Sequence, residues 1–420
     1  MQSSRSTRRF ISAFFVVVAT VSATAQETTL VSVDSSGAQG SDHSGFYDLS
    51  PISADGNVVA FTSDASDLVA NDNNGYSDVF VHDRTTGTTE RVSVDSSGAE
   101  GDDNSWFPAL SADGQLVAFV SFATNLVSGD NNLLQDIFVH DRSTGLTERV
   151  DVGPSGAEAD GPNYYATLSA DGRIVAFASY ATNLVAGDAN AQVDVFVHDR
   201  ATGATERVSV DSSGAEGDDG SGDLPLLALS SDGSIVAFES KATNLVAGDT
   251  NGFRDVFVHD RTTGITELVS VRSNGAQGDG DCDWPSLSAD GRFVAFESGA
   301  SNLVSGDLNA AWDVFVHDRS TGNTTRVDVS STNIQGNKGG GASSLSDDGR
   351  LVAFNSGSTN LVGGDTAGFN DVFIRDRSNG MTERVSVDSA GAEADGDSWI
   401  PRFSVDGNAI TFGSVATNLV

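Results

Sequence analysis

Short apolar runs alternate with segments rich in glycine, aspartate, serine and asparagine along nearly the whole chain of 420 residues. One run in each unit is the heptapeptide Asp-Val-Phe-Val-His-Asp-Arg or a close variant. It is spaced at intervals of 58, 58, 61, 58 and 58 residues and begins at Asp78, Asp136, Asp194, Asp255, Asp313 and Asp371. Such regular spacing indicates one supersecondary unit copied in tandem.

Each unit is predicted to hold four short strands. In the copy that follows Asp102 these are residues 106–111, 116–121, 136–141 and 147–152. A Ser-x-Asp-Gly marker joins the first two strands through a tight hairpin, because Asp-Gly tolerates the positive φ that such turns need. The marker occurs seven times, ending at Gly56, Gly114, Gly172, Gly233, Gly291, Gly349 and Gly407. The second and third strands are apolar at successive positions, which indicates strands covered on both faces.

These patterns predict an all-β fold, a seven-bladed β-propeller of four-stranded antiparallel blades. Six full blades are expected within residues 42–397. Residues 27–34 match a fourth strand and residues 398–420 supply a first and a second strand, so the two chain ends are expected to share the closing blade. In this prediction the closing blade lacks its third strand. The chain ends at Val420, where the other copies continue into their heptapeptide, so we expect the sequence to be truncated there.

The Ser-Ala-Asp-Gly, Val-Ala-Phe and Asp-Val-Phe-Val-x-Asp elements together resemble the repeat of TolB-type, WD-repeat-like propellers, over essentially all of residues 26–420. Two departures recur. Alanine stands before Asp-Gly in four of the seven markers, where the family usually has proline, and an Ala-Thr-Asn-Leu-Val-x-Gly-Asp segment or a close variant lengthens each repeat. The resemblance implies a propeller fold and a periplasmic or secreted location. It implies no mechanism, because such propellers serve as translocation partners, peptidase domains, glycan lyases and scaffolds.

Residues 1–25 have the features of a secretory signal peptide: three arginines, an apolar run, and Ala-Thr-Ala at residues 23–25. Cleavage after Ala25 would leave a secreted or periplasmic propeller of residues 26–420. No later segment approaches the roughly 20 apolar residues that a membrane span needs, so no transmembrane span is expected.

The chain is strongly acidic, with 59 acidic and 23 basic side chains and a formal net charge of −36, which removal of the three arginines lowers to −39. Such a field disfavours nucleic acid and anionic lipid, and it favours metal cations or basic partners; the alternative is that the acidity serves solubility alone. Cys282 is the only cysteine, so no intramolecular disulfide can form.

The loop between the second and third strands carries an acid, an amide and an acid at its first, third and seventh positions. The sets are Asp72, Asn74 and Asp78; Asp130, Asn132 and Asp136; Asp188, Asn190 and Asp194; Asp249, Asn251 and Asp255; and Asp307, Asn309 and Asp313. Closely spaced oxygen ligands on a glycine-bearing loop are what Ca²⁺ requires, so these residues are candidate metal ligands, although no cofactor is required. The pattern is two residues shorter than the Asp-x-Asp-x-Asp-Gly loop and lacks its terminal glutamate. The alternative is that aspartate and asparagine cap turns through their own backbone.

Five heptapeptides carry a histidine: His82, His140, His198, His259 and His317. Five symmetric copies cannot all belong to one catalytic constellation, so we interpret them as structural and predict no catalytic residue. The residues that break the repeat are His43, Lys241, Cys282 and Lys338, and they include neither a Ser/His/Asp set nor a zinc spacing.

Aromatic residues stand near the start of several first strands, at Trp106, Tyr164, Trp284 and Trp399. The first strand lines the channel of a propeller. These side chains are therefore candidate stacking surfaces for sugars or extended peptides, with packing between blades as the alternative.

The sequence favours an exported, monomeric, non-catalytic scaffold that binds a protein or a glycan through an acidic loop face. One alternative is an enzyme, either a propeller-type glycan lyase or the propeller domain of a hydrolase, and another is a structural cell-envelope protein. The enzyme alternative requires polar residues that break the repeat to converge at the mouth of the channel.

Overall fold

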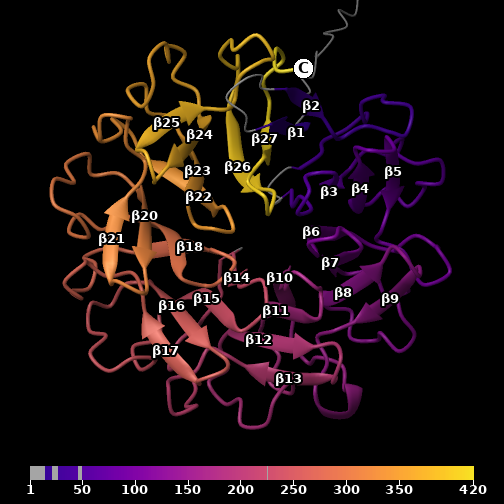
Figure 1. Cartoon of the computed structure of the whole chain (residues 1–420). Helices are drawn as coiled ribbons and strands as arrows, with labels where there is room; N and C mark the ends of the chain where they lie inside the picture. Colours follow the sequence, from indigo (N-terminus) through magenta and orange to yellow (C-terminus); the bar gives the residue numbers. More distant parts are fainter. Residues whose placement is uncertain (1–14, 21–26, 46–49, 225) are drawn as a thin grey trace, which may run out of the picture.

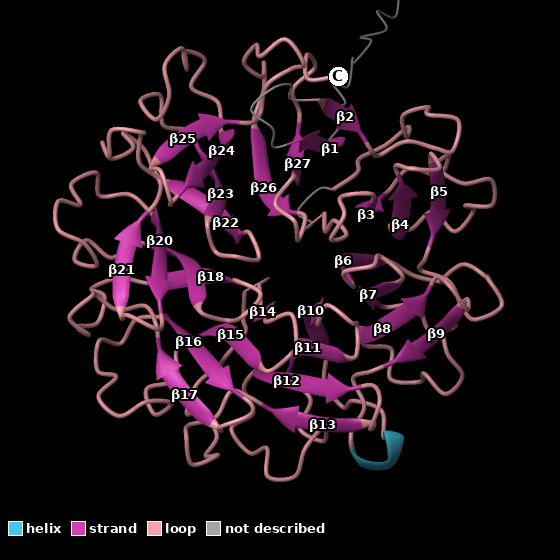
Figure 2. Cartoon of the chain, viewed as in Figure 1, coloured by secondary structure: helices cyan, strands magenta, loops and turns pink. Residues whose placement is uncertain are grey.

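A computed structural model describes residues 15–20, 27–45, 50–224 and 226–420, and it arranges seven sheets in a ring (Figure 1). Strands and loops make up nearly all of it, and the helix in the described part of the chain is the single 3₁₀ turn Pro154–Gly156 (Figure 2). The seven-bladed propeller predicted from the repeat is confirmed.

Each blade is a sheet whose strands follow one another from the channel outwards. Blade 2 has β6 (Ser105–Leu110), β7 (Leu116–Ser121), β8 (Asp136–Asp141) and β9 (Leu146–Arg149). Blade 3 has β10 (Asn163–Leu168), β11 (Ile174–Ser179), β12 (Asp194–Asp199) and β13 (Ala204–Arg207). Blade 4 has β14 (Ala228–Leu229), β15 (Ile235–Ser240), β16 (Asp255–Asp260) and β17 (Ile265–Leu268).

The other two complete blades have the same order. Blade 5 has β18 (Cys282–Leu287), β19 (Phe293–Ser298), β20 (Asp313–Asp318) and β21 (Asn323–Arg326). Blade 6 has β22 (Gly340–Leu345), β23 (Leu351–Ser356), β24 (Asp371–Asp376) and β25 (Met381–Arg384). In blade 1, β3 (Val58–Ser63), β4 (Asp78–Asp83) and β5 (Thr88–Arg91) form the sheet, and single bridges pair Ser44 and Ile52 with β3 on its inner side.

The core consists of apolar layers between the blades. Six pairs of fully buried phenylalanines from second and third strands lie directly opposite in register, such as Phe61 and Phe80, whose ring centroids are 5.9 Å apart. The aliphatic residues beside them, such as Val79 and Val81, are also fully buried. Both faces of these strands are covered because each blade packs between two neighbours, which accounts for the continuous apolar runs in the sequence.

Both ends of the chain build blade 7, as predicted. Its order from the channel is β26 (Ser398–Phe403), β27 (Ala409–Ser414), β1 (Phe15–Thr20) and β2 (Thr28–Leu30). The prediction that this blade lacks a third strand is wrong. β1 fills that place, paired along its length with β27 and on its other side with β2.

β1 fits between its neighbours because Val16, Val17, Val18 and Ala19 are all buried, as the third strand of a blade must be on both faces. A short run of β-branched residues can form a strand that is buried on both faces, and it can also form the apolar core of a signal peptide. The sequence pattern alone therefore does not separate the two roles. The cleavage site predicted after Ala25 lies outside the described residues, and export stays a prediction.

Candidate functional site at the mouth of the central channel

The loops predicted to bind Ca²⁺ hold their acids around an arginine. In blade 1, Arg91 Nη1 lies 3.4 Å from Asp72 Oδ1 and 3.2 Å from Asp78 Oδ2, and Nη2 lies 3.0 Å from Glu100 Oε2. Arginines of the fourth strands take the same place in four further blades: Arg149, Arg207, Arg326 and Arg384. The guanidinium thus lies among the acids that were predicted to bind a metal ion.

The amide of each loop donates a hydrogen bond where a metal ligand would offer oxygen. Asn74 Nδ2 donates to Asp78 Oδ2 over 3.0 Å and to Gly101 O over 3.0 Å, while its Oδ1 accepts the backbone N–H of Tyr76. The last acid is fully buried and also accepts a hydrogen bond from Ser93 Oγ. These contacts are those of the turn-capping alternative.

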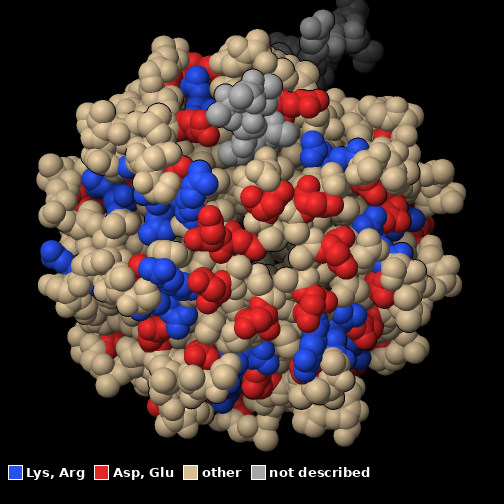
Figure 3. Space-filling view, viewed as in Figure 1, with Lys and Arg blue, Asp and Glu red and all other residues tan. Residues whose placement is uncertain are grey.

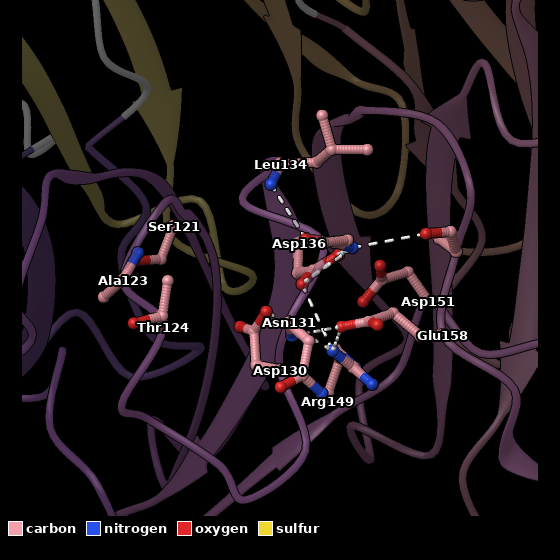
Figure 4. A network of polar contacts seen from close by, with 12 residues as sticks. Ser121, Ala123, Thr124, Asp130, Asn131, Leu134, Asp136, Arg149, Asp151 and Glu158 are labelled. Atoms are coloured by element: carbon pink, nitrogen blue, oxygen red, sulfur yellow. Dashed lines mark hydrogen bonds and ion pairs between the residues drawn. The ribbon is translucent and has the colours of Figure 1, made fainter.

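Three copies nevertheless bring three carboxylate groups together, with oxygens within 4.8 Å of one another. They are Asp130, Asp136 and Glu158; Asp188, Asp194 and Glu216; and Asp365, Asp371 and Glu393. Figure 4 shows the first of these sets gathered on Arg149. Burial, reinforced by the nearby charge of Asp136, raises the pKa of Asp130 to about 7. Burial and Asp194 likewise raise the pKa of Asp188 to about 6. The acids therefore outnumber the single internal cation.

Blade 4 departs from this pattern. Leu268 stands where blades 1, 2, 3, 5 and 6 have arginine, and Gln277 stands where blades 1, 2, 3 and 6 have glutamate. Gln277 Nε2 donates to Asp249 Oδ1 over 2.9 Å, and Asn251 Nδ2 donates to Asp255 Oδ2 over 2.7 Å. Here one cation and one anion are lost together, and amide donors satisfy the remaining acids.

Calcium is expected to change the stability of the wild-type protein little, because an arginine already neutralises most of the acidic sets. We expect the melting temperature of chelated protein to rise by less than about 2 °C when Ca²⁺ is added at millimolar concentration, since a ligand stabilises only in proportion to its occupancy. Differential scanning calorimetry with Mg²⁺ as a control checks this. A rise that saturates with Ca²⁺ alone would instead support the candidate metal ligands.

The five histidines are parts of the blade-to-blade contacts. Each ring Nδ1 lies 2.8–2.9 Å from a threonine Oγ1 of the neighbouring fourth strand, as in the pair His198 and Thr205. Thr205 Oγ1 in turn donates to Val152 O of the preceding blade over 2.7 Å, so it accepts from the imidazole. In blade 6, Arg375 Nη1 takes the same place beside Thr382.

The first strands carry a repeated bulge that turns side chains towards the channel. The register shifts at the same point in five blades, and the residue there has a positive φ: Phe107, Tyr165, Trp284, Ala342 and Ile400. Bulky residues rarely adopt this conformation, and bulges often re-aim side chains next to binding sites. Trp284 is one of these bulge residues, whereas Trp106, Tyr164 and Trp399 precede the bulge, so the four predicted aromatics do not occupy one equivalent position.

Two of the predicted aromatics meet in one cavity, which we call the aromatic pocket. It has a volume of about 470 Å³ and is lined by Trp106, Phe107, Phe122, Tyr164 and Tyr165. The rings also contact one another. Trp106 meets Phe122 edge to face at 5.8 Å, and Phe107 meets Tyr165 at 4.9 Å.

Polar groups of blades 1 and 2 complete the aromatic pocket: His43, Asp64, Ser77 and Gln135. His43 was singled out in the sequence because it breaks the repeat. Trp284 and Trp399 are absent from the lining, so the structure brings together only half of the predicted aromatic set.

Sequence reasoning missed a second group of residues that break the repeat. Glu239 and Glu297 stand before the last serine of the second strand, where other blades have threonine, valine, alanine, asparagine or glycine. Glu239 accepts the backbone N–H of Leu224 over 2.6 Å, and burial raises its pKa to about 8. Glu297 accepts the backbone N–H of Ala342 in the next blade, and burial raises its pKa to about 7. Aligning the copies position by position would have revealed both glutamates.

A nearby ion pair also breaks the repeat. Arg254 Nη1 lies 3.1 Å from Asp283 Oδ1, and Asp283 stands where blades 2, 3 and 7 have Trp106, Tyr164 and Trp399. Glu239 and Glu297 therefore accept hydrogen bonds from backbone N–H groups, and Asp283 forms an ion pair with Arg254. The cluster required by the enzyme alternative is partly present, but its carboxyl groups are already engaged.

No family model matches this sequence, and no curated protein matches it. The fold is similar to that of oligogalacturonate lyase in complex with manganese, with 14% identity over 96% of each chain and a TM-score of 0.53. It is similar to oligogalacturonate lyase from Vibrio parahaemolyticus, with 12% identity over 97% of this chain and 98% of the other and a TM-score of 0.53. TolB from Acinetobacter baumannii matches with 18% identity and a TM-score of 0.43, over 78% of this chain and 63% of TolB. Identities at this level show the propeller fold alone.

Within the described residues, no helix has the length and apolar character needed to cross a membrane.

Proposed function

We propose that this chain is an exported, non-catalytic propeller that binds an oligosaccharide in the aromatic pocket at the mouth of its channel. The observation that carries the proposal is the meeting of five aromatic side chains from blades 2 and 3 around one cavity of about 470 Å³. Aromatic faces stack on the apolar faces of sugar rings, and the nearby acid, amide and hydroxyl groups can bond to sugar hydroxyls.

The size and shape of the pocket support a chain of sugars over a folded protein partner. Protein interfaces of standard size bury about 800 Å² per partner over broad surfaces, whereas this cavity is concave and small. The acids that break the repeat are held by groups of the protein itself, which supports binding without catalysis. Glu239 and Glu297 accept backbone hydrogen bonds, and Asp283 is paired with Arg254.

Substitution of Trp106 by alanine is expected to weaken oligosaccharide binding by about tenfold or more, because buried aromatic anchors dominate binding energy. The measurement is a titration of tryptophan fluorescence or heat with a panel of neutral and acidic oligosaccharides. Tyr164→Ala should behave similarly. Trp399→Ala is a matched control, because Trp399 holds the same position in blade 7 and lies outside the aromatic pocket.

Two outcomes would contradict the proposal. Binding of an extended peptide but of no oligosaccharide would assign the pocket to peptides. If the protein converts a bound acidic oligosaccharide into unsaturated products, which ultraviolet absorbance would detect, it is a lyase and not a binding protein.

A further inference from the structure

One basic residue stands in the wall of the central channel at a position where the other blades have small residues. Arg402 lies opposite Thr411 in blade 7. The equivalent residues, placed by the same pairing with the second strand, are Pro51, Ala109, Thr167, Ala228, Ser286 and Ser344. Arg402 is therefore the strongest departure from sevenfold symmetry inside the channel.

Arg402 lines a cavity of about 210 Å³ in the channel, and every other described residue that lines this cavity is uncharged. Most of the wall is apolar, with Leu110 from blade 2, Leu227 and Leu229 from blade 4, and Leu287 from blade 5. This channel cavity shares only Phe107 and Tyr165 with the aromatic pocket, so the two cavities adjoin at these rings and otherwise have different linings.

The guanidinium of Arg402 is only partly satisfied by the protein. Nη1 donates to Pro401 O over 2.9 Å and to Ser343 O over 3.5 Å. These are its hydrogen bonds to the part of the chain that the structure describes, and no carboxylate of that part lies within 4.0 Å. Burial lowers the pKa of Arg402 to about 10, which the more distant charge of Glu297 partly opposes. Arg402 is only partly buried, because it faces the channel cavity, and without a carboxylate beside it the guanidinium leaves donors available to an anion in that cavity.

We propose that the channel cavity binds a small organic monocarboxylate, whose carboxylate group accepts hydrogen bonds from Nε and Nη2 of Arg402 and whose apolar body lies against the leucines. The planar fork of arginine matches a carboxylate group. A cavity of about 150 Å³ holds benzene, so this one accommodates a body of about eight non-hydrogen atoms.

The electrostatic surroundings restrict the charge of the ligand. Figure 3 shows acidic side chains around the central opening of the ring, with basic side chains farther out. A negative field at the opening repels a dianion more strongly than a monoanion, while the single cation inside can neutralise only one charge. The site therefore favours one carboxylate per molecule.

Isothermal titration with benzoate and benzamide tests the proposal, because the two probes have nearly the same shape and size and differ in charge. Benzoate is expected to bind with a Kd of about 1 mM or tighter, and benzamide at least about tenfold more weakly, since charge-assisted hydrogen bonds are roughly twice as strong as neutral ones. Acetate and butyrate extend the series to smaller bodies. Failure of all three carboxylates to bind, or equal binding of benzamide, overturns the proposal.

Variants of the wall separate this site from the aromatic pocket. Arg402→Met should lose benzoate binding by about tenfold or more and keep oligosaccharide binding, whereas Trp106→Ala should do the reverse. Arg402→Lys keeps the charge without the fork and should retain part of the affinity. Arg272→Met, in the loop between β17 and β18, is the matched control. Unchanged benzoate binding by a folded Arg402→Met protein would show that the carboxylate binds elsewhere.

Discussion

Removal of residues 1–25 is expected to lower the free energy of unfolding by about 5 kcal/mol or more, because it takes β1 out of the closing blade. Val16, Val17 and Val18 are at most 1% exposed, and full burial of one such side chain contributes about 1.5–3 kcal/mol. The edges of β27 and β2 would also lose the backbone partners that β1 provides. Denaturant unfolding of the shortened and full chains measures the difference.

A pair of valine substitutions in blade 7 controls for general effects of shortening the chain. Val17→Asp in the full chain should destabilise the protein nearly as strongly as the deletion, because it places an unpaired carboxylate in the core. Val405→Asp should have little effect, because Val405 is 37% exposed in the turn between β26 and β27. If exported protein begins at Gln26 and unfolds like the full chain, β1 is dispensable and the signal-peptide prediction is right.

The propeller could be predicted from the sequence because the repeat records the packing of each blade. The apolar residues on both sides of Phe80 indicated a strand that packs between two neighbouring blades, and the Asp-Gly turns indicated where the hairpins lie. The role of residues 15–20 could not be predicted, because a buried third strand and the core of a signal peptide demand the same side chains. The decision between them depends on contact with β27, almost 400 residues away in sequence.

The candidate site was harder to predict than the fold. Asn74 and Asp78 were interpreted as oxygen ligands, but which atom of an amide faces a neighbour depends on its hydrogen bonds. Arg91, which pairs with Asp78, follows it by 13 residues and belongs to the next strand. The change to Leu268 and Gln277 in blade 4 was the available signal that this arginine balances the acids of the loop, although blade 5 keeps Arg326 beside Gln335. The bulge at Phe107 could not be predicted in this way, because the equivalent residues of four other blades share its positive φ but not its residue type.

Replacement of Arg207 by leucine is expected to destabilise the protein by about 3–5 kcal/mol, because it removes the cation from a group of three acids of which one is fully buried and two are partly buried. Arg207 Nη1 lies 3.5 Å from Asp188 Oδ1, 3.3 Å from Asp194 Oδ2 and 2.7 Å from Glu216 Oε1. Asp194 is fully buried, so its charge cannot turn to water. Denaturant unfolding at constant pH measures the change.

The loss should depend on pH in a defined direction. The pKa of Asp188 is already raised to about 6 by burial and by Asp194, and removal of the arginine should raise it further. A carboxyl group whose pKa is higher in the folded than in the unfolded protein adds stability as the pH falls and loses it as the pH rises through the folded value. The Arg207→Leu protein should therefore be closer to wild type at pH 5 than at pH 8. An equal deficit at both values would mean that lost packing, not charge, explains the change.

Blade 4 supplies the matched control, since it already has Leu268 and Gln277 in these two places. The double variant Arg207→Leu, Glu216→Gln reproduces that arrangement in blade 3, removing one cation and one anion together. It should recover part of the stability lost by the single variant, because residues in one charge network are coupled rather than additive. The single variant should also gain a calcium-dependent rise in melting temperature, since its three carboxylates then lack an internal cation. If the double variant is less stable than Arg207→Leu, or if Ca²⁺ leaves the single variant unchanged, the guanidinium is not what balances these acids.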